Sequence, residues 1–300
     1  MSNDHFKIAK DGVAVVGEII KTAGDNPNVK EAGNNLGQTA VTLTKLVNNA
    51  LLPLAAVNFA CEKSRIYFQG KFQQDLSEKV AKIPEEDIVE PKASIAGPAL
   101  QGLAFTHEEQ NLKDMYLNLL ATAMDGRVST TAHPAFVEII KQLDGMDAAL
   151  VRHALQFIED IPIVQLLLTT AGEQGYRIIL SHLVNLAKPP VGEPVENPML
   201  PVMIDNWARL GLVEIDYKQH LTRPSAYDWV ETRPEFIKIR EQYEHDNIKL
   251  TYQKGIIRCT YFGQRFAAAI GLLPYTYVKA DAWHIAPDCE ANVQRRGNKE

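Results

Sequence analysis

The stretch THEEQNLKDMYLNLLATAMDG, residues 106–126, carries the pattern on which the predicted fold depends. Its apolar residues recur every three or four positions, as one face of an α-helix requires: Leu112, Met115, Tyr116, Leu119, Leu120 and Ala123. Thr106 and Glu109 have the spacing of a capping box, which favours a helix start, and Asp125-Gly126 favours a helix end. The stretch therefore predicts an amphipathic helix that packs against others of its kind.

The residues around this stretch predict more helices of the same bundle. His133-Pro134 opens one of them, because proline is tolerated at the first helical position. Two further helices are predicted near 147–159 and 162–171. Residues 83–98, which precede the first helix, contain three prolines and are interpreted as a linker, since proline and the residue before it disfavour helix.

Long helices are predicted in the N-terminal part. Apolar residues at helical spacing indicate one helix over 6–23 and a second helical region over 28–79, which Pro53 should kink or divide. These helices carry more apolar surface than one antiparallel pair covers. We therefore expect the protein to self-associate as a homo-oligomer through residues 6–80.

The C-terminal part follows a different pattern. Five prolines between 188 and 201 predict a second boundary. Beyond it the expected order is helix, strand, hairpin and helix, over residues 199–210, 212–215, 249–260 and 262–272, with a mostly helical insertion over 217–248. This order is typical of a small winged-helix-like module.

These patterns together predict a mainly α fold with long N-terminal helices, a central helical bundle and a small C-terminal α+β module. The predicted regions are an N-terminal long-helix region (1–82), the bundle (83–190), the winged-helix-like module with its helical insertion (191–275) and a polar tail (276–300).

The composition is that of a globular protein from a reducing compartment. Its 300 residues are 46% hydrophobic and 23% charged with a net charge of −6, which argues against disorder and against a basic nucleic-acid arm. The 3 cysteines lie far apart and form neither a disulfide framework nor a zinc motif. No signal pattern is present, and no apolar run reaches the roughly 20 residues of a membrane-spanning helix. We therefore expect a cytoplasmic protein.

No familiar catalytic, metal or cofactor motif is present. His107 lacks a second histidine four residues on, the glycines form no phosphate-binding loop, and no serine or cysteine lies in an activating motif. Glu85, Glu86 and Asp87 are adjacent in a proline-bounded segment, which suits a solvated loop better than an acid–base pair. We expect no cofactor and no bound metal, and the balance favours a protein that is not an enzyme.

One candidate binding feature is the uncharged stretch LVNNALLPLAAVNFAC, residues 46–61. It predicts either a buried core helix broken by Pro53 or an apolar surface that contacts a membrane or a partner. Under the second interpretation the contact residues are Leu51, Leu52, Leu54, Val57 and Phe59.

A second candidate feature is a group of basic residues in the winged-helix-like module: Arg209, Lys254, Arg258 and Arg265. A helix that reads DNA needs a denser basic face than residues 199–210, which offer only Arg209. We therefore favour protein docking by this module, and nucleic-acid binding is the alternative.

Several sequence runs resemble the abortive infection alpha (Abi-alpha) family of bacterial proteins over about residues 20–270. They are IPEEDIVEP (83–91), IAGP (95–98), MYLNLLATAMD (115–125), HPAFVEII (133–140), LGLVEI (210–215), GIIR (255–258) and FG (262–263). The family's ending usually reads Leu-Thr-Pro-Phe-Gly, whereas this chain has CTYFG at 259–263, a departure that is conservative in shape.

The resemblance implies a role in phage defence, in which an infected cell stops growing or dies. It supplies no catalytic residues to carry over. We therefore expect a non-enzymatic effector or sensor that contacts a phage or host protein, or lies peripherally at the inner membrane. A regulator that binds nucleic acid through the C-terminal module is the alternative.

Overall fold

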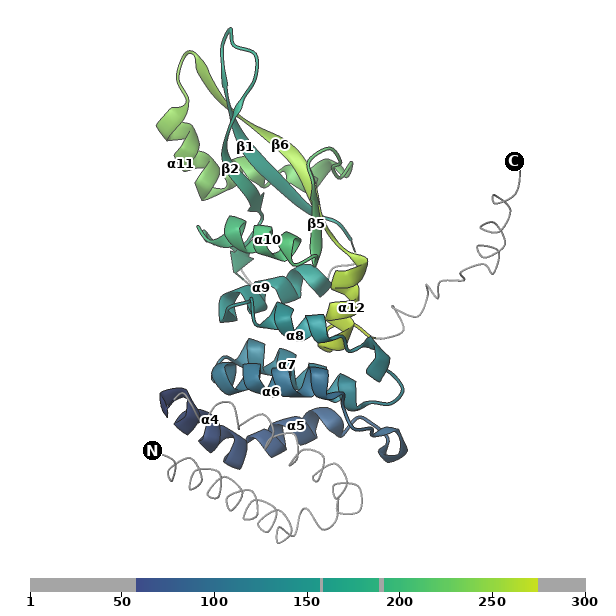
Figure 1. Cartoon of the computed structure of the whole chain (residues 1–300). Coiled ribbons are helices and arrows are strands. Elements are labelled where there is room, and N and C mark those ends of the chain that lie inside the picture. Colours follow the sequence, from purple (N-terminus) through teal and green to yellow (C-terminus); the bar gives the residue numbers. More distant parts are fainter. Residues whose placement is uncertain (1–57, 157–158, 189–191, 275–300) are drawn as a thin grey trace, which may run out of the picture.

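A computed structural model describes residues 58–156, 159–188 and 192–274 of the protein. These residues are about 52% helical and 20% strand, and the strands form a curled four-stranded antiparallel sheet. Figure 1 shows stacked pairs of helices with the sheet at one end of the stack. The fold is therefore mixed α/β, and the predicted mainly α fold with a helical bundle and a winged-helix-like module is wrong.

The helical stack contains six α-helices and two short 3-10 turns within the described residues. They are α4 (Asn58–Gly70), α5 (Phe72–Val80), η2 (Glu85–Asp87), α6 (Ala93–Thr106), α7 (Gln110–Met124), η3 (Ser129–Thr131), α8 (Pro134–Ile140) and α9 (Gly145–Gln156). Helix α7 lies inside the stack, because every residue from Met115 to Met124 except Asn118 is buried. The predicted central helix is confirmed, and so is the start of α8 at Pro134, where His133 Nδ1 accepts the N–H of Ala135 at 3.1 Å.

The predicted capping box at Thr106 and Glu109 is wrong. Thr106 is the last residue of α6, and its hydroxyl donates to the carbonyl of Gly102 at 3.1 Å. Glu109 precedes α7 without a side-chain cap. The Thr-x-x-Glu pattern of a capping box is present, but the apolar run before it continues helix α6 through Thr106. The Thr106 hydroxyl therefore bonds to the last turn of α6 and not to the first turn of α7.

The proposed linker over 83–98 is part of the packed structure. Val89 N–H donates to Met124 O at 2.9 Å, and Gly126 N–H donates to Asp87 O at 2.7 Å, so this segment pairs with the end of α7. Helix α6 begins at Ala93 and includes Pro98. A proline in a helix loses one backbone hydrogen bond. Here the burial of one whole face of α6 offsets that loss.

The sheet has the strand order β2-β1-β6-β5, in the strands β1 (Ile161–Thr170), β2 (Arg177–Val184), β5 (Val213–Asp216) and β6 (Ile248–Cys259). The helix predicted over 162–171 is therefore strand β1. Residues 163–168 are all buried. A segment that is buried on both faces lacks the hydrophobic periodicity by which a strand is distinguished from a helix in the sequence. The hairpin predicted over 249–260 is also wrong, because β6 is one continuous strand.

Gly255 lies inside β6 and does not form the predicted turn. A Cβ atom at this position would lie 2.6 Å from Cδ1 of Tyr217, which follows β5. The glycine therefore makes room for the tyrosine ring to cross the sheet.

Each face of the sheet has its own cover. One face packs against η4 (Pro224–Tyr227), η5 (Val230–Thr232) and α11 (Pro234–Tyr243), which form a second hydrophobic core with β1 and β6. The other face meets α9, α10 (Leu200–Arg209) and α12 (Tyr261–Ala269) in the main core. The predicted helix 199–210 and strand 212–215 are confirmed as α10 and β5. A two-stranded ribbon, β3 (Ala187–Lys188) and β4 (Glu193–Pro194), lies between β2 and α10 in the sequence.

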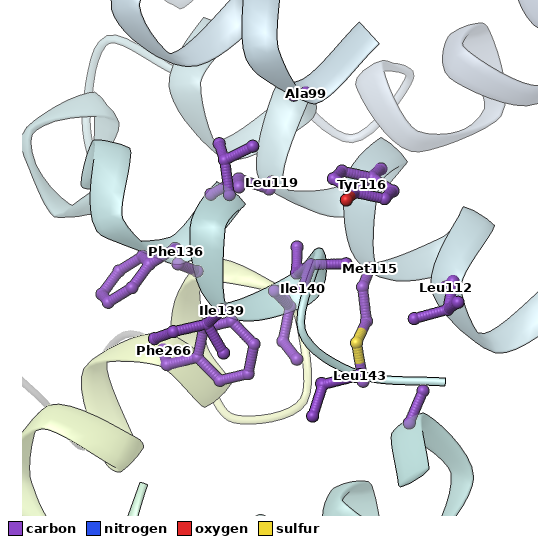
Figure 2. Close-up of a cluster of buried hydrophobic side chains, with 14 of the residues drawn as sticks. Ala99, Leu112, Met115, Tyr116, Leu119, Phe136, Ile139, Ile140, Leu143 and Phe266 are labelled. Atoms are coloured by element: carbon purple, nitrogen blue, oxygen red, sulfur yellow. The ribbon is translucent and has the colours of Figure 1, made fainter. Parts of the chain in front are cut away.

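Helix α12 joins the C-terminal part to the helical stack. Asn118 donates to Ile270 O at 2.9 Å and Thr122 donates to Ala269 O at 2.8 Å, so α7 holds the end of α12. Figure 2 shows Phe266 of α12 among the side chains of α7 and α8, with its ring 5.5 Å from that of Phe136. The main core is continuous from Tyr67 to Ile270.

Candidate functional site

A pocket of about 300 Å³ lies beside β2, between α10 and α11. Its lining includes residues 180–184 of β2, residues 196–198, 200 and 201 before and within α10, and Arg233, Glu235, Lys238 and Ile239 at and within α11. Because α10 and α11 cover opposite faces of the sheet, a pocket that touches both must lie along the outer edge of β2. We call it the edge pocket.

The innermost charged group of the edge pocket is Arg233, which is 1% exposed. Its guanidinium forms a bidentate pair with Glu235, with N–O distances of 2.9 and 2.6 Å. It also donates to the carbonyls of Leu186 and Val195, at 2.6 and 2.8 Å. These bonds use the planar donor set that arginine offers and lysine lacks. Leu186 precedes β3 and Val195 follows β4, so Arg233 ties α11 to the open end of the β3–β4 ribbon.

The rim of the edge pocket carries a second ion pair. Lys238 Nζ lies 2.7 and 2.8 Å from the two carboxylate oxygens of Glu196. Both side chains are exposed, so water screens the pair and it contributes little to stability. The pair instead affects the electrostatics of the pocket, because the positive charge of Lys238 and the negative charge of Glu196 cancel at the rim.

His182 lines the edge pocket and has a strained backbone conformation, with φ of +56°. Every other described residue with a positive φ is a glycine. The β1–β2 register shifts at this point, so that Ser181 and His182 both lie opposite Gln165 in a β-bulge. A side chain in this backbone region is rare and needs support from its surroundings.

Tyr217 and Asp205 supply that support. The Tyr217 hydroxyl accepts the backbone N–H of His182 at 3.1 Å and lies 3.0 Å from His182 Nδ1. His182 Nε2 lies 3.0 Å from Asp205 Oδ1. The tyrosine proton is then directed at Nδ1, and Nε2 carries the proton that Asp205 accepts.

This cluster contains an Asp–His pair but no nucleophile that the pair could activate. Both imidazole nitrogens are used inside the protein. Burial raises the pKa of Tyr217 to about 12, so the phenol stays neutral near pH 7. A catalytic base needs a free nitrogen directed at a substrate proton. The geometry therefore suits the support of the bulge better than acid–base chemistry.

Three exposed apolar residues lie at the starts of α9 and α10, near residues that line the edge pocket, and we call them the apolar patch. They are Met146, Met199 and Val202, which are 58%, 54% and 55% exposed. Asn197 connects two of them, because its amide nitrogen lies 3.5 Å from Met146 Sδ and its side-chain oxygen accepts the backbone N–H of Met199. Methionine side chains adapt to different partners, and clustered exposed apolar residues mark contact surfaces.

The four predicted nucleic-acid residues do not form one basic surface. Arg258 is bound to both carboxylate oxygens of Asp160, at 2.9 and 2.7 Å. Lys254, four residues earlier on β6, lies over the Tyr227 ring at 5.2 Å. Arg209 on α10 binds Asn206 and Gln142, and Arg265 on α12 lies over the Tyr261 ring at 5.9 Å.

The apolar residues predicted to contact a membrane or partner are almost all outside the described residues. Leu51, Leu52, Leu54 and Val57 precede the first described residue, and Phe59 is the second residue of α4. None of the helices in the described ranges is both long and apolar enough to cross a membrane. The same ranges contain no group of three or more His, Cys, Asp or Glu residues that could hold a metal ion.

A sequence model of the family described as abortive infection alpha matches residues 64–270. The chain belongs to this family. No curated protein and no solved structure matches it. The family membership predicted from the sequence runs is confirmed, and it links the protein to abortive infection, a form of phage defence.

The runs that resemble the abortive infection alpha family lie at packing contacts. Residues 87–89 pair with the end of α7, as described above. The Phe136 ring lies 5.4 Å from that of Phe262. A Cβ atom at Gly263 would overlap the carbonyl of Leu212. In this member of the family these residues hold the elements together.

Sequence reasoning missed the edge pocket and its residues. His182, Asp205 and Tyr217 come from a strand, a helix and a loop, and no spacing in the sequence connects them. The one available signal was Gly255 inside a β-prone stretch, since a glycine within a strand indicates close approach of another group.

Proposed function

We propose that this protein is a non-enzymatic effector or sensor of abortive infection that acts by contact with a phage or host protein. The observation that carries the proposal is the apolar patch of Met146, Met199 and Val202, each more than half exposed. Family membership supplies the biological context. In the nearby cluster of His182, Tyr217 and Asp205, both imidazole nitrogens are already bonded within the protein. This arrangement favours a role in binding over a role in catalysis.

The nucleic-acid alternative receives less support. Binding to phosphates needs several unpaired cations on one surface. Arg258 is neutralised by Asp160, and the ammonium of Lys254 lies against an aromatic ring. If the alternative holds nevertheless, binding to DNA should fall steeply as salt is added, because phosphate contacts release counterions.

The proposal is tested by expression in a phage-sensitive host, with plating efficiency and membrane potential as readouts. The variant Met199→Ser/Val202→Ser removes the patch at exposed positions, where substitutions usually change stability by no more than about 0.5 kcal/mol. Phe105→Ser, at an exposed position near the end of α6, is the matched control. We expect the patch variant to lose protection with an unchanged melting curve and the control to keep it. A folded patch variant that protects as well as the wild type would contradict the proposal.

A further inference from the structure

Strand β2 is an edge strand, and the edge pocket follows it for five consecutive residues, 180–184. In the described parts of the chain β2 pairs with β1 alone, so no strand occupies its outer side. Five residues of strand span roughly 13 Å, the length of a short extended peptide. The other edge strand, β5, has 4 residues. The sheet therefore offers one long unoccupied edge.

Most of the surface that the edge pocket exposes is apolar. Leu180, Val184 and Ile239 line it, together with Pro198 and Pro201. A volume of about 300 Å³ is at the lower end of the range for small-molecule sites, and it suits apolar side chains of a peptide.

The charges that line the edge pocket cancel one another. Arg233 is paired with Glu235, and Lys238 is paired with Glu196. His182 is bound to Asp205. A phosphate, a nucleotide or a charged metabolite would find no unpaired partner among these groups, and burial of an unpaired charge is costly. The charge balance is complementary to an uncharged apolar segment.

We infer that the edge pocket binds an extended, uncharged, apolar peptide segment of a partner protein, which adds as a strand to β2. The peptide backbone bonds to the outer side of β2, and alternate side chains enter the pocket. The inference rests on the proposed function, since it names the kind of protein segment that is recognised.

The test is selection of a display library of short random peptides on the full-length protein. Selected peptides are then measured by calorimetry against the wild type, Ser181→Trp, which fills the pocket from β2, and Glu214→Trp, a matched control on the exposed face of edge strand β5. Circular dichroism checks each fold. If Ser181→Trp does not fold, Asn197→Trp fills the pocket from the opposite wall.

We expect enriched peptides to be apolar and uncharged, to bind the wild type and Glu214→Trp equally, and to bind the filled pocket at least about tenfold more weakly. N-methylation of alternate peptide nitrogens should weaken binding by about tenfold, because it removes strand hydrogen bonds. Failure to enrich any peptide, enrichment of charged or helical ones, or equal binding to the filled pocket would overturn the inference. Binding that behaves as expected, while both Ser181→Trp and Met199→Ser/Val202→Ser still protect cells, would instead contradict the proposed function.

Discussion

The hydroxyl of Tyr116 provides a sharp test of the packing in the helical stack. Tyr116 lies on α7 and is fully buried, and it belongs to the cluster shown in Figure 2. Its oxygen has no hydrogen-bond partner in the described part of the chain and lies against Gly102 of α6, where a Cβ atom would overlap it. Burial raises the pKa of this phenol well above its usual value, so it stays neutral.

The substitution Tyr116→Phe removes this hydroxyl and keeps the ring. A buried hydroxyl without a partner costs about 1–3 kcal/mol, and the gap that its removal leaves is smaller than a methyl group. We therefore expect the variant to be more stable than the wild type by about 1 kcal/mol. For a protein of this size that corresponds to a rise in melting temperature of roughly 2–4 °C.

Tyr227→Phe is the matched control, because its hydroxyl is satisfied. It donates to Gly255 O at 2.8 Å and accepts the N–H of Leu221 at 3.1 Å. Its removal loses two hydrogen bonds and should lower stability by about 2 kcal/mol. Urea unfolding of both variants measures the two effects. A loss of stability in Tyr116→Phe equal to that in Tyr227→Phe would refute the reasoning, because it would mean that the Tyr116 hydroxyl is bonded.

Three further predictions concern other parts of the protein. Burial raises the pKa of Asp147, so its ionised form opposes folding and stability should fall as pH rises from the unfolded pKa toward the folded one. Asp147→Asn keeps an acceptor for Trp207 Nε1 and should therefore melt higher than the wild type at pH 7, with the difference lost at acidic pH; a lower melting temperature at pH 7 would contradict this. Arg233→Ala leaves the partly buried Glu235 and two carbonyls without their partner and should cost about 3 kcal/mol in urea unfolding. Self-association through residues 6–80 stays a prediction, and light scattering that gives the 33.4 kDa of one chain at micromolar concentration would disprove it.

The sequence predicts well those elements whose apolar residues repeat at one clear spacing. Helix α7 and helix α10 have an apolar stripe at helical spacing, and β5 is short and follows a helix end at Gly211. Strand β1 was missed because it is buried on both faces, and its tertiary neighbours decide its conformation. The candidate site could not be predicted, since its backbone strain at His182 depends on groups 23 and 35 residues away.

The attachment of α12 to α7 bears on how the protein is synthesised. Asn118 and Thr122 bond to residues that lie 152 and 147 positions later in the chain. While a ribosome is still translating the sheet, Phe136 and its neighbours lack the cover that Phe266 later provides. Contacts of such long sequence separation form late and slow folding. The native core is therefore completed only after translation has passed residue 270, so a chain that stops within the sheet exposes apolar surface and becomes a substrate for proteases and chaperones.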